Sequence, residues 1–162
     1  MFSGIVSNVF TKKLNDASVY KFYSAQKYPD LMHPKGGVGL EVKASNKPLK
    51  GGEGYNGHSG WHIIVCYQIF DDGEIEFTQV EIAELVGYEC TASDWKYLGS
   101  RRNINESQRT ETYVTNGVGT AKLRDGSLYL NPEYVKITPA LKRYRTKLAA
   151  QLPIPFYSPF AD

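Results

Sequence analysis

Three charged side chains in the N-terminal third of the chain have the types and spacing that suit metal-dependent chemistry on a phosphate. Asp30 is followed after ten residues by Glu41, and Lys43 comes two positions later. Apolar residues alternate with other residues over 38–43, which predicts a β-strand with Glu41 and Lys43 on one face. Two converging carboxylates can hold a Mg²⁺ ion, and a neighbouring ammonium can stabilise the charge that develops on the phosphate.

Hydrophobic periodicity and turn residues predict the elements that must position these side chains. The most apolar run, 61–70, indicates a central strand buried on both faces, and a turn at 71–73 leads into a partner strand at 74–85. Thr138 has the type of an N-cap for a helix over 138–152. The other expected elements are a helix at 5–14, strands at 18–26 and 38–44, a turn or short strand at 28–37, a loop at 45–60, an irregular segment at 94–115, and a hairpin at 121–130 with Asp125 and Gly126 at its tip.

Composition and element order predict one α/β or α+β domain over 1–162, with a mixed central β-sheet flanked by helices. The net charge of +2 neither demands nor excludes a nucleic-acid partner. Cys66 and Cys90 lack the spacing of a zinc site, and Cys66, in an apolar run, is expected to be a buried free thiol. No run approaches 18 apolar residues and the N-terminus lacks a basic segment, so we expect a cytoplasmic protein without a membrane span.

The order Pro29-Asp30, ten residues, Glu41-Val42-Lys43 resembles the signature of the PD-(D/E)XK nuclease superfamily, and the resemblance covers residues 18–70. It implies a restriction-endonuclease-like fold in which the acid of "PD" opens one strand of a hairpin and the "ExK" lies on its partner. It also implies catalytic roles for Asp30, Glu41 and Lys43. A Mg²⁺ ion, replaceable by Mn²⁺, would be held by Asp30, Glu41 and the carbonyl oxygen of Val42.

Within that superfamily the chain looks most like a type II restriction endonuclease. That resemblance implies site-specific hydrolysis of phosphodiester bonds in double-stranded DNA by a homodimer. The single nuclease domain would have a catalytic core at about 18–90, a DNA-recognition segment at about 94–130, and a C-terminal helix and tail at 138–162. One departure is that no Glu precedes Glu41, so a third acidic ligand would come from elsewhere. The candidates are Glu53, Glu74 and Glu76.

Two polar segments have the side-chain types that contact DNA, because Arg and Lys bind phosphates while Arg and Asn read base edges. The first is the Gly-rich loop at 45–60, and the second is the stretch 100–112. The residues expected to contact DNA are Lys47, Lys50, His58, Arg101, Arg102, Asn103 and Arg109.

The C-terminal segment is expected to contribute to a homodimer interface, because its apolar side chains need a partner surface. The helix stripe consists of Leu141, Tyr144 and Leu148, and the tail carries Ile154, Phe156, Tyr157 and Phe160. The alternative is that the tail packs on its own subunit.

Two other functions stay open from the sequence. With 162 residues the chain is short for a restriction enzyme, and a structure-selective nuclease such as a Holliday junction resolvase is one alternative. The other is a non-catalytic DNA- or protein-binding module. In that case Glu41 and Lys43 would be a surface pair on an amphipathic strand, and Asp30 would belong to a turn.

Overall fold

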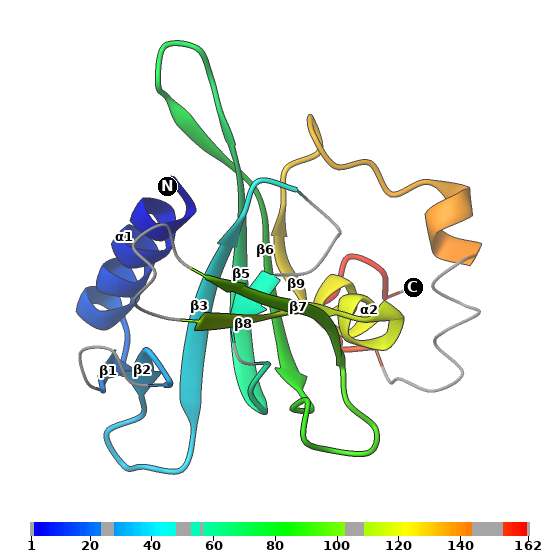
Figure 1. The fold of residues 1–162 in the computed structure, drawn as a ribbon. Coiled ribbons are helices and arrows are strands. Elements are labelled where there is room, and N and C mark those ends of the chain that lie inside the picture. The colour runs from blue at the N-terminus through cyan, green and yellow to red at the C-terminus, as the bar shows by residue number, and fades with distance from the viewer. Residues whose placement is uncertain are drawn as a thin grey trace.

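The fold is a mixed α+β arrangement built on a six-stranded sheet, shown by a computed structural model that describes residues 2–23, 28–47, 53–55, 57–102, 109–143 and 154–161 (Figure 1). The sheet has the strand order β1-β2-β3-β5-β6-β9, and a separate three-stranded sheet has the order β4-β8-β7. The strands of the large sheet are β1 (Lys21–Phe22), β2 (Leu31–Met32), β3 (Gly39–Ser45), β5 (Gly60–Ile69), β6 (Ile75–Leu85) and β9 (Ser127–Leu130). Those of the small sheet are β4 (Glu53–Tyr55), β7 (Trp95–Arg102) and β8 (Arg109–Thr115).

The centre of the large sheet combines parallel and antiparallel pairing, as predicted for a mixed sheet. Strand β3 runs parallel to β5, with Glu41 opposite His62, and β5 pairs with β6 as an antiparallel hairpin. The predicted central strand is confirmed, because Ile64, Val65 and Cys66 of β5 are fully buried. The hairpin turn needs Gly73, whose φ of 87° lies in the region that favours glycine.

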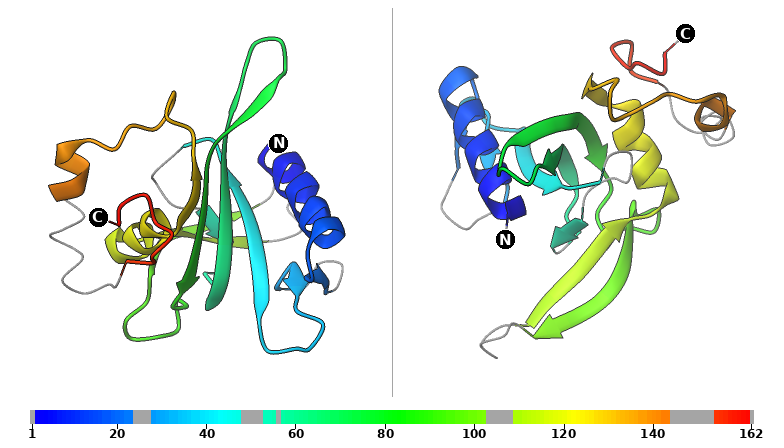
Figure 2. Two further views of the ribbon diagram at one scale, coloured as in Figure 1. Left: turned by 180° about the vertical axis from the view of Figure 1, so that it is seen from behind. Right: turned by 90° about the horizontal axis from the view of Figure 1, so that it is seen from above.

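Helix α1 (Phe2–Ala17) covers one face of the large sheet, and helix α2 (Gly117–Asp125) lies on the other (Figures 1 and 2). Alternation along the strands divides their side chains between two cores. The α1 face is packed by Val6, Leu31, Leu40, Val42, Ile63, Val65 and Tyr67. The α2 face is packed by Ile64, Cys66, Ala83, Leu85, Trp95 and Leu123.

The hairpin predicted at 121–130 is wrong, because Gly117–Asp125 forms helix α2 and only Ser127–Leu130 is a strand, paired with β6. Asn116 is the signal that outweighs the turn pattern, since its side chain accepts hydrogen bonds from the N–H groups of Val118 and Gly119, both at 3.0 Å. Gly126 ends the helix where the chain crosses β6 closely. A Cβ there would lie 1.8 Å from the carbonyl oxygen of Ile82.

Other segments differ from the prediction in extent. The segment 94–115 is an antiparallel hairpin, β7–β8, and the loop at 45–60 contains β4, which pairs with β8. Of the strand predicted at 18–26, only Lys21–Phe22 is extended in a sheet among its described residues. The C-terminal helix begins as predicted, with the Thr138 hydroxyl accepting from Leu141 N–H at 3.2 Å, while Tyr144 and Leu148 lie outside the described residues.

Candidate active site

The short strand β2 brings Asp30 to the edge of β3. Leu31 and Met32 pair with Leu40 and Gly39, and the pairing stops there. Asp30 lies just before this pair, and its carboxylate accepts a hydrogen bond from Val42 N–H at 2.8 Å. The side chain therefore satisfies a strand-edge N–H that β2 is too short to reach.

The same contact fixes the direction of the Val42 carbonyl. In an extended strand the N–H and C=O of one residue point to the same side, and the Val42 N–H points to Asp30 rather than to β5. The Val42 carbonyl consequently points along the edge that Asp30 occupies. This geometry fits the expected role of that oxygen as a third ligand beside the two carboxylates.

Glu41 and Lys43 leave β3 on the face opposite α1, as the alternation predicts. The Lys43 ammonium donates to the Glu41 carboxylate, and both side chains are largely buried, with 22% and 11% of their surfaces exposed. β3 thus places Glu41 in contact with Lys43, and the residue before β2 places the Asp30 carboxylate on the N–H of Val42, the residue between them in sequence. The convergence of all three side chains on one point, which the sequence spacing predicts, stays a prediction.

The pKa of Asp30 responds to both neighbouring charges, the negative one on Glu41 and the positive one on Lys43. Burial raises the pKa of Asp30 above its ordinary value, and the negative charge of Glu41 raises it further. The hydrogen bond from Val42 and the charge of Lys43 act in the opposite direction. A divalent cation between the carboxylates would relieve their repulsion and release Lys43 from Glu41.

Aromatic side chains that the sequence did not predict as site residues lie on one side of Glu41 and Lys43. His62 is 2% exposed and stands opposite Glu41 in the β3–β5 ladder, with its ring 5.3 Å from that of Trp95. Burial lowers the pKa of His62 to about 4, so the imidazole is neutral near pH 7. Its Nδ1 lies 2.8 Å from the Gly60 carbonyl, which can only accept, so Nδ1 carries the proton.

Tyr28 lies between two histidines beside the site. Its ring centroid is 4.5 Å from that of His58 and 6.2 Å from that of His62, and its hydroxyl donates to the Ser59 carbonyl. Burial, and then the charge of Glu41, raise its pKa to about 12. Alternation along 60–69 could have placed His62 on this face. The parallel pairing of β5 with β3 was needed to bring it beside Glu41.

No family model, curated protein or solved structure matches the chain. The chemistry of the site is accordingly argued from its own residues. Among the described residues, no group of three or more His, Cys, Asp or Glu side chains is arranged to hold a metal. The ligands expected from the sequence, Asp30, Glu41 and the Val42 carbonyl, are all oxygen donors, and oxygen donors are the ligands that Mg²⁺ and Mn²⁺ prefer.

The acidic residues considered as further ligands lie elsewhere or are not described. Glu76 accepts hydrogen bonds from Asn131 at 3.1 Å and from the Tyr134 hydroxyl at 2.7 Å. Glu74 is exposed at the β5–β6 turn, and the side chain of Glu53 lies outside the described residues. The expectation that Glu74 or Glu76 could supply a third acidic ligand is therefore corrected.

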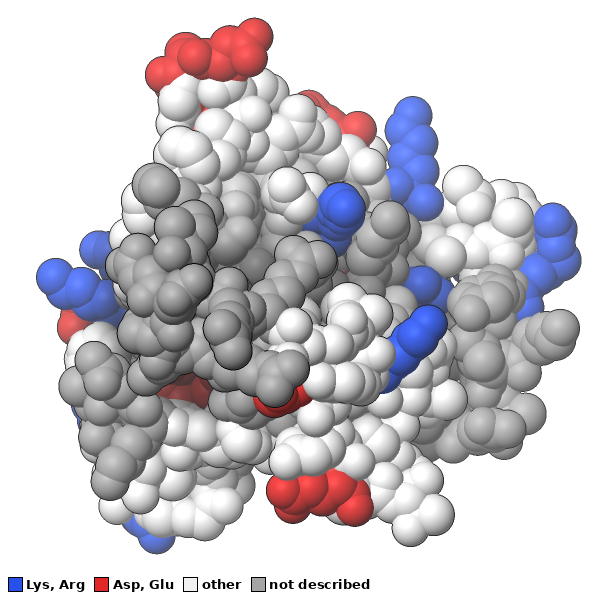
Figure 3. All heavy atoms as spheres, in the orientation of Figure 1, with Lys and Arg blue, Asp and Glu red and all other residues white. Residues whose placement is uncertain are grey.

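The residues expected to contact DNA fall into two places. His58 packs on Tyr28 at the site, and its carbonyl accepts from Trp95 Nε1 at 3.2 Å. Arg101 and Arg102 end β7 and Arg109 begins β8, and the side chains of all three lie outside what the structure describes. Lys47 is exposed after β3, whereas Lys50 and Asn103 lie outside the described residues. On the face shown in Figure 3, the described Lys and Arg side chains are scattered rather than collected into one patch.

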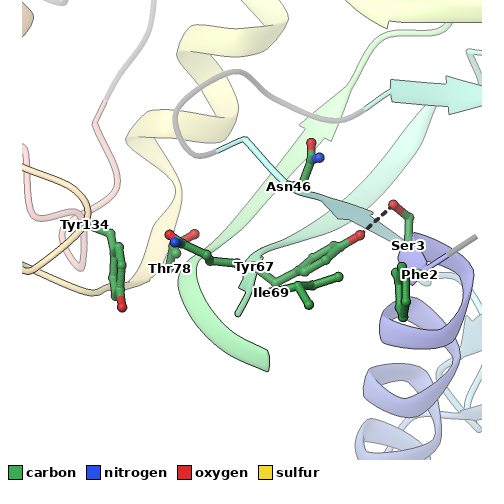
Figure 4. A pocket seen from close by; sticks show the side chains of 8 residues that line it. Phe2, Ser3, Asn46, Tyr67, Ile69, Thr78 and Tyr134 are labelled. Carbon is green, nitrogen blue, oxygen red and sulfur yellow. Dashed lines mark hydrogen bonds between the residues drawn. The ribbon is translucent and has the colours of Figure 1, made fainter. Parts of the chain in front are cut away.

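A hollow lies at the other end of β5 from His62 (Figure 4). Its volume is about 500 Å³, and a hydrogen bond of 2.8 Å between the Ser3 and Tyr67 hydroxyls crosses one side of it. The lining residues are Phe2, Ser3, Asn46, Tyr67, Gln68, Ile69, Thr78 and Tyr134. None of them is charged.

One further expectation concerns membranes. Among the described residues, no helix has both the length and the apolar character needed to cross a bilayer.

Proposed function

We propose that the protein is a Mg²⁺-dependent deoxyribonuclease of the PD-(D/E)XK type, with a restriction-endonuclease-like fold, that hydrolyses phosphodiester bonds of duplex DNA. The observations that carry the proposal are the hydrogen bond from Val42 N–H to the Asp30 carboxylate and the contact of Lys43 with Glu41, the two residues on either side of Val42.

The division of labour follows from the side chains. Asp30, Glu41 and the Val42 carbonyl would hold the cation, which supplies Lewis acidity to a phosphate oxygen and to water. Lys43, once released from Glu41, donates to the attacking water and the phosphate and stabilises the added negative charge. Water would form the new bond to phosphorus as the bond to the leaving sugar oxygen breaks, and the proton that the attacking water loses would pass to solvent water, which protonates the leaving oxygen. Neutral His62, with Tyr28 and Trp95, limits access of bulk water from the β5 side.

A cleavage assay tests the proposal. The full chain should cut a linear duplex in Mg²⁺ or Mn²⁺ and not in EDTA. Ca²⁺ should support binding with little cutting, because it accepts looser geometry and is a weaker Lewis acid here. Lys43→Ala should abolish cutting while duplex binding in Ca²⁺ persists. Lys12→Ala, exposed on α1 across the sheet, is the matched control and should cut normally.

The other outcomes separate the alternatives. Cutting of branched DNA only would favour a structure-selective nuclease. DNA binding without cutting in any divalent metal would favour a binding module. Undiminished cutting by the Lys43 variant, or full activity in EDTA, would refute the proposal.

We also propose a homodimer, since cutting both strands at one place needs two such sites. The C-terminal tail offers mixed support, because Phe156 is 94% exposed whereas Phe160 is 2% exposed and packs on its own subunit. Light scattering should give twice the 18.2 kDa of one chain without DNA, and that mass plus the mass of one duplex when DNA is bound. A monomer in both samples would favour a nicking enzyme.

A further inference from the structure

The hollow at the end of β5 lies where segments that are far apart in the sequence meet. Its lining comes from the first turn of α1, the residue that follows β3, the strands β5 and β6, and the segment after β9 (Figure 4). Its volume of about 500 Å³ is typical of small-molecule sites, which span about 300–1,000 Å³. The lining residue Tyr67 belongs to the core on the α1 face, whereas Glu41 leaves β3 on the other face. The hollow is therefore separate from the candidate active site.

A bulge in β6 turns two consecutive side chains toward the α1 face. Tyr67 of β5 stands opposite Phe77, and the residue before Tyr67 stands opposite Gln79. Thr78 is passed over in this register. Consecutive side chains of a regular strand point to opposite faces, but here Phe77 packs edge-on against Phe10 of α1, with ring centroids 6.1 Å apart, while Thr78 lines the hollow. Bulges commonly re-aim a side chain beside a functional site.

The side chain that the bulge re-aims carries an unsatisfied polar group. Thr78 is 2% exposed, and among the described residues no group forms a hydrogen bond with its Oγ1. The backbone at this residue is paired, because its carbonyl oxygen accepts from Asn131 N–H at 2.9 Å. A buried hydroxyl without a partner destabilises a fold. A polar ligand in the hollow would supply the missing partner.

Aromatic rings form much of the remaining lining. Figure 4 shows Tyr134 at one end of the hollow and Phe2 at the other, with Tyr67 between them. The Tyr134 hydroxyl donates to the Glu76 carboxylate at 2.7 Å, and the Tyr67 hydroxyl is paired with that of Ser3 at 2.8 Å. Because both tyrosine hydroxyls are already paired, these residues offer a ligand mainly their rings.

Two amides complete the lining, and none of the described residues that line the hollow is charged. The amides are those of Asn46 and of the exposed Gln68. An amide combines a donor and an acceptor, which match the N6 amino group and the N7 acceptor of adenine. Bases also stack on aromatic side chains. A phosphate would find no cationic side chain in this lining, so the hollow suits a nucleoside better than a nucleotide.

We propose that the hollow binds an uncharged adenine nucleoside. The base lies against the aromatic rings, Gln68 pairs with the edge of the base, and the Thr78 hydroxyl forms a hydrogen bond with the ligand. This inference goes beyond the proposed nuclease function and does not depend on it, because the hollow and Glu41 lie on opposite faces of the sheet. Binding requires no divalent cation.

The test is calorimetric titration of the full chain with adenosine in EDTA, together with thermal melting. Adenosine should bind saturably and raise the melting temperature, because a ligand that binds only the folded state stabilises it. Thr78→Val keeps the shape of the side chain and removes the hydroxyl, so adenosine should bind roughly tenfold more weakly. Gln68→Leu should also weaken binding. Thr91→Val, exposed in the connection that follows the other end of β6, is the matched control and should bind like the wild type.

Melting without ligand distinguishes a binding role of Thr78 from a structural one. Thr78→Val should melt no lower than the wild type, because its hydroxyl has no protein partner to lose. A variant that melts well below the wild type would show that the hydroxyl is paired within the fold, and this would overturn the proposal.

The choice of ligand is tested with two further compounds. AMP should bind no more tightly than adenosine, and maltose, an uncharged sugar without a base, should not bind. Tighter binding of AMP, binding of maltose in place of adenosine, no binding of adenosine, or undiminished binding by the Thr78 variant would each overturn the proposal.

The results also separate the hollow from the nuclease assignment. Glu41→Gln should leave adenosine binding unchanged, and a loss would place the nucleoside at the candidate active site and overturn the proposal. Adenosine binding that depends on Thr78, in a protein that never cuts DNA, would refute the nuclease and leave the hollow as a nucleoside site. Mg²⁺-dependent cutting without adenosine binding would do the reverse.

Discussion

The two faces of the six-stranded sheet use neighbouring residues of the same strands for different ends. On the α1 face, Leu40 and Val42 of β3 pack with apolar side chains of β5 and α1. On the α2 face, Glu41 of β3, His62 of β5 and Glu81 of β6 are buried polar groups. Burial of apolar side chains stabilises a fold, whereas burial of polar groups costs free energy unless they are paired. We therefore call the α1 face the apolar face, and the α2 face, which combines an apolar cluster of its own with these polar groups, the polar face.

The largest expected effect is on the polar face, at Glu41. Glu41→Gln keeps the size of the side chain and removes one of two carboxylates proposed to hold the cation. Loss of several kcal/mol of transition-state stabilisation predicts a fall in cleavage rate on the order of 10³-fold. Single-turnover cleavage measures the rate, and thermal melting should change little. A variant that cuts within tenfold of the wild type would contradict the comparison of the faces.

The adjacent residue on the apolar face should show the opposite behaviour. Leu40→Ala leaves a cavity against α1 and should lower the free energy of unfolding by about 3 kcal/mol, within the usual range for a buried leucine. Cleavage by the folded protein below its melting temperature should stay close to wild type, because Leu40 points away from Glu41. Urea unfolding measures the loss. A variant of normal stability but without activity would show that the faces are not separate.

Much of this arrangement follows from the sequence, and its limits have physical causes. The alternation at 38–43 and the apolar run at 61–70 predicted β3 and β5, because period-2 patterns are local. The hairpin spacing also placed Asp30 beside β3, where its carboxylate accepts from Val42 N–H. The parallel pairing of β3 with β5 depends on a distant strand, so His62 was not recognised as a neighbour of Glu41. At 121–126 the Asp-Gly turn pattern was outweighed by the Asn116 cap and by packing of Leu123 in the core.

A smaller effect concerns Glu81, a buried acid on the polar face outside the proposed site. Burial raises its pKa to about 8, against the nearby charge of Arg124, which lowers it. Between about pH 4.5 and 8 the folded state keeps a proton that the unfolded state releases, so the free energy of unfolding should fall as pH rises. Glu81→Gln should remove this part of the pH dependence, measured by urea unfolding at several pH values. The exposed Glu74→Gln is the control, and an unchanged pH profile in the Glu81 variant would mean that Glu81 is ionised throughout.

The most direct test of the account is a Mn²⁺ titration followed by calorimetry, in the presence of duplex DNA and with Lys43→Ala as the non-cutting background. The account predicts a bound Mn²⁺ that is lost when Asp30→Asn or Glu41→Gln is added, and kept when the exposed Glu74→Gln is added. Mn²⁺ bound equally well after either change at Asp30 or Glu41 would contradict the claim that these two carboxylates form the metal site.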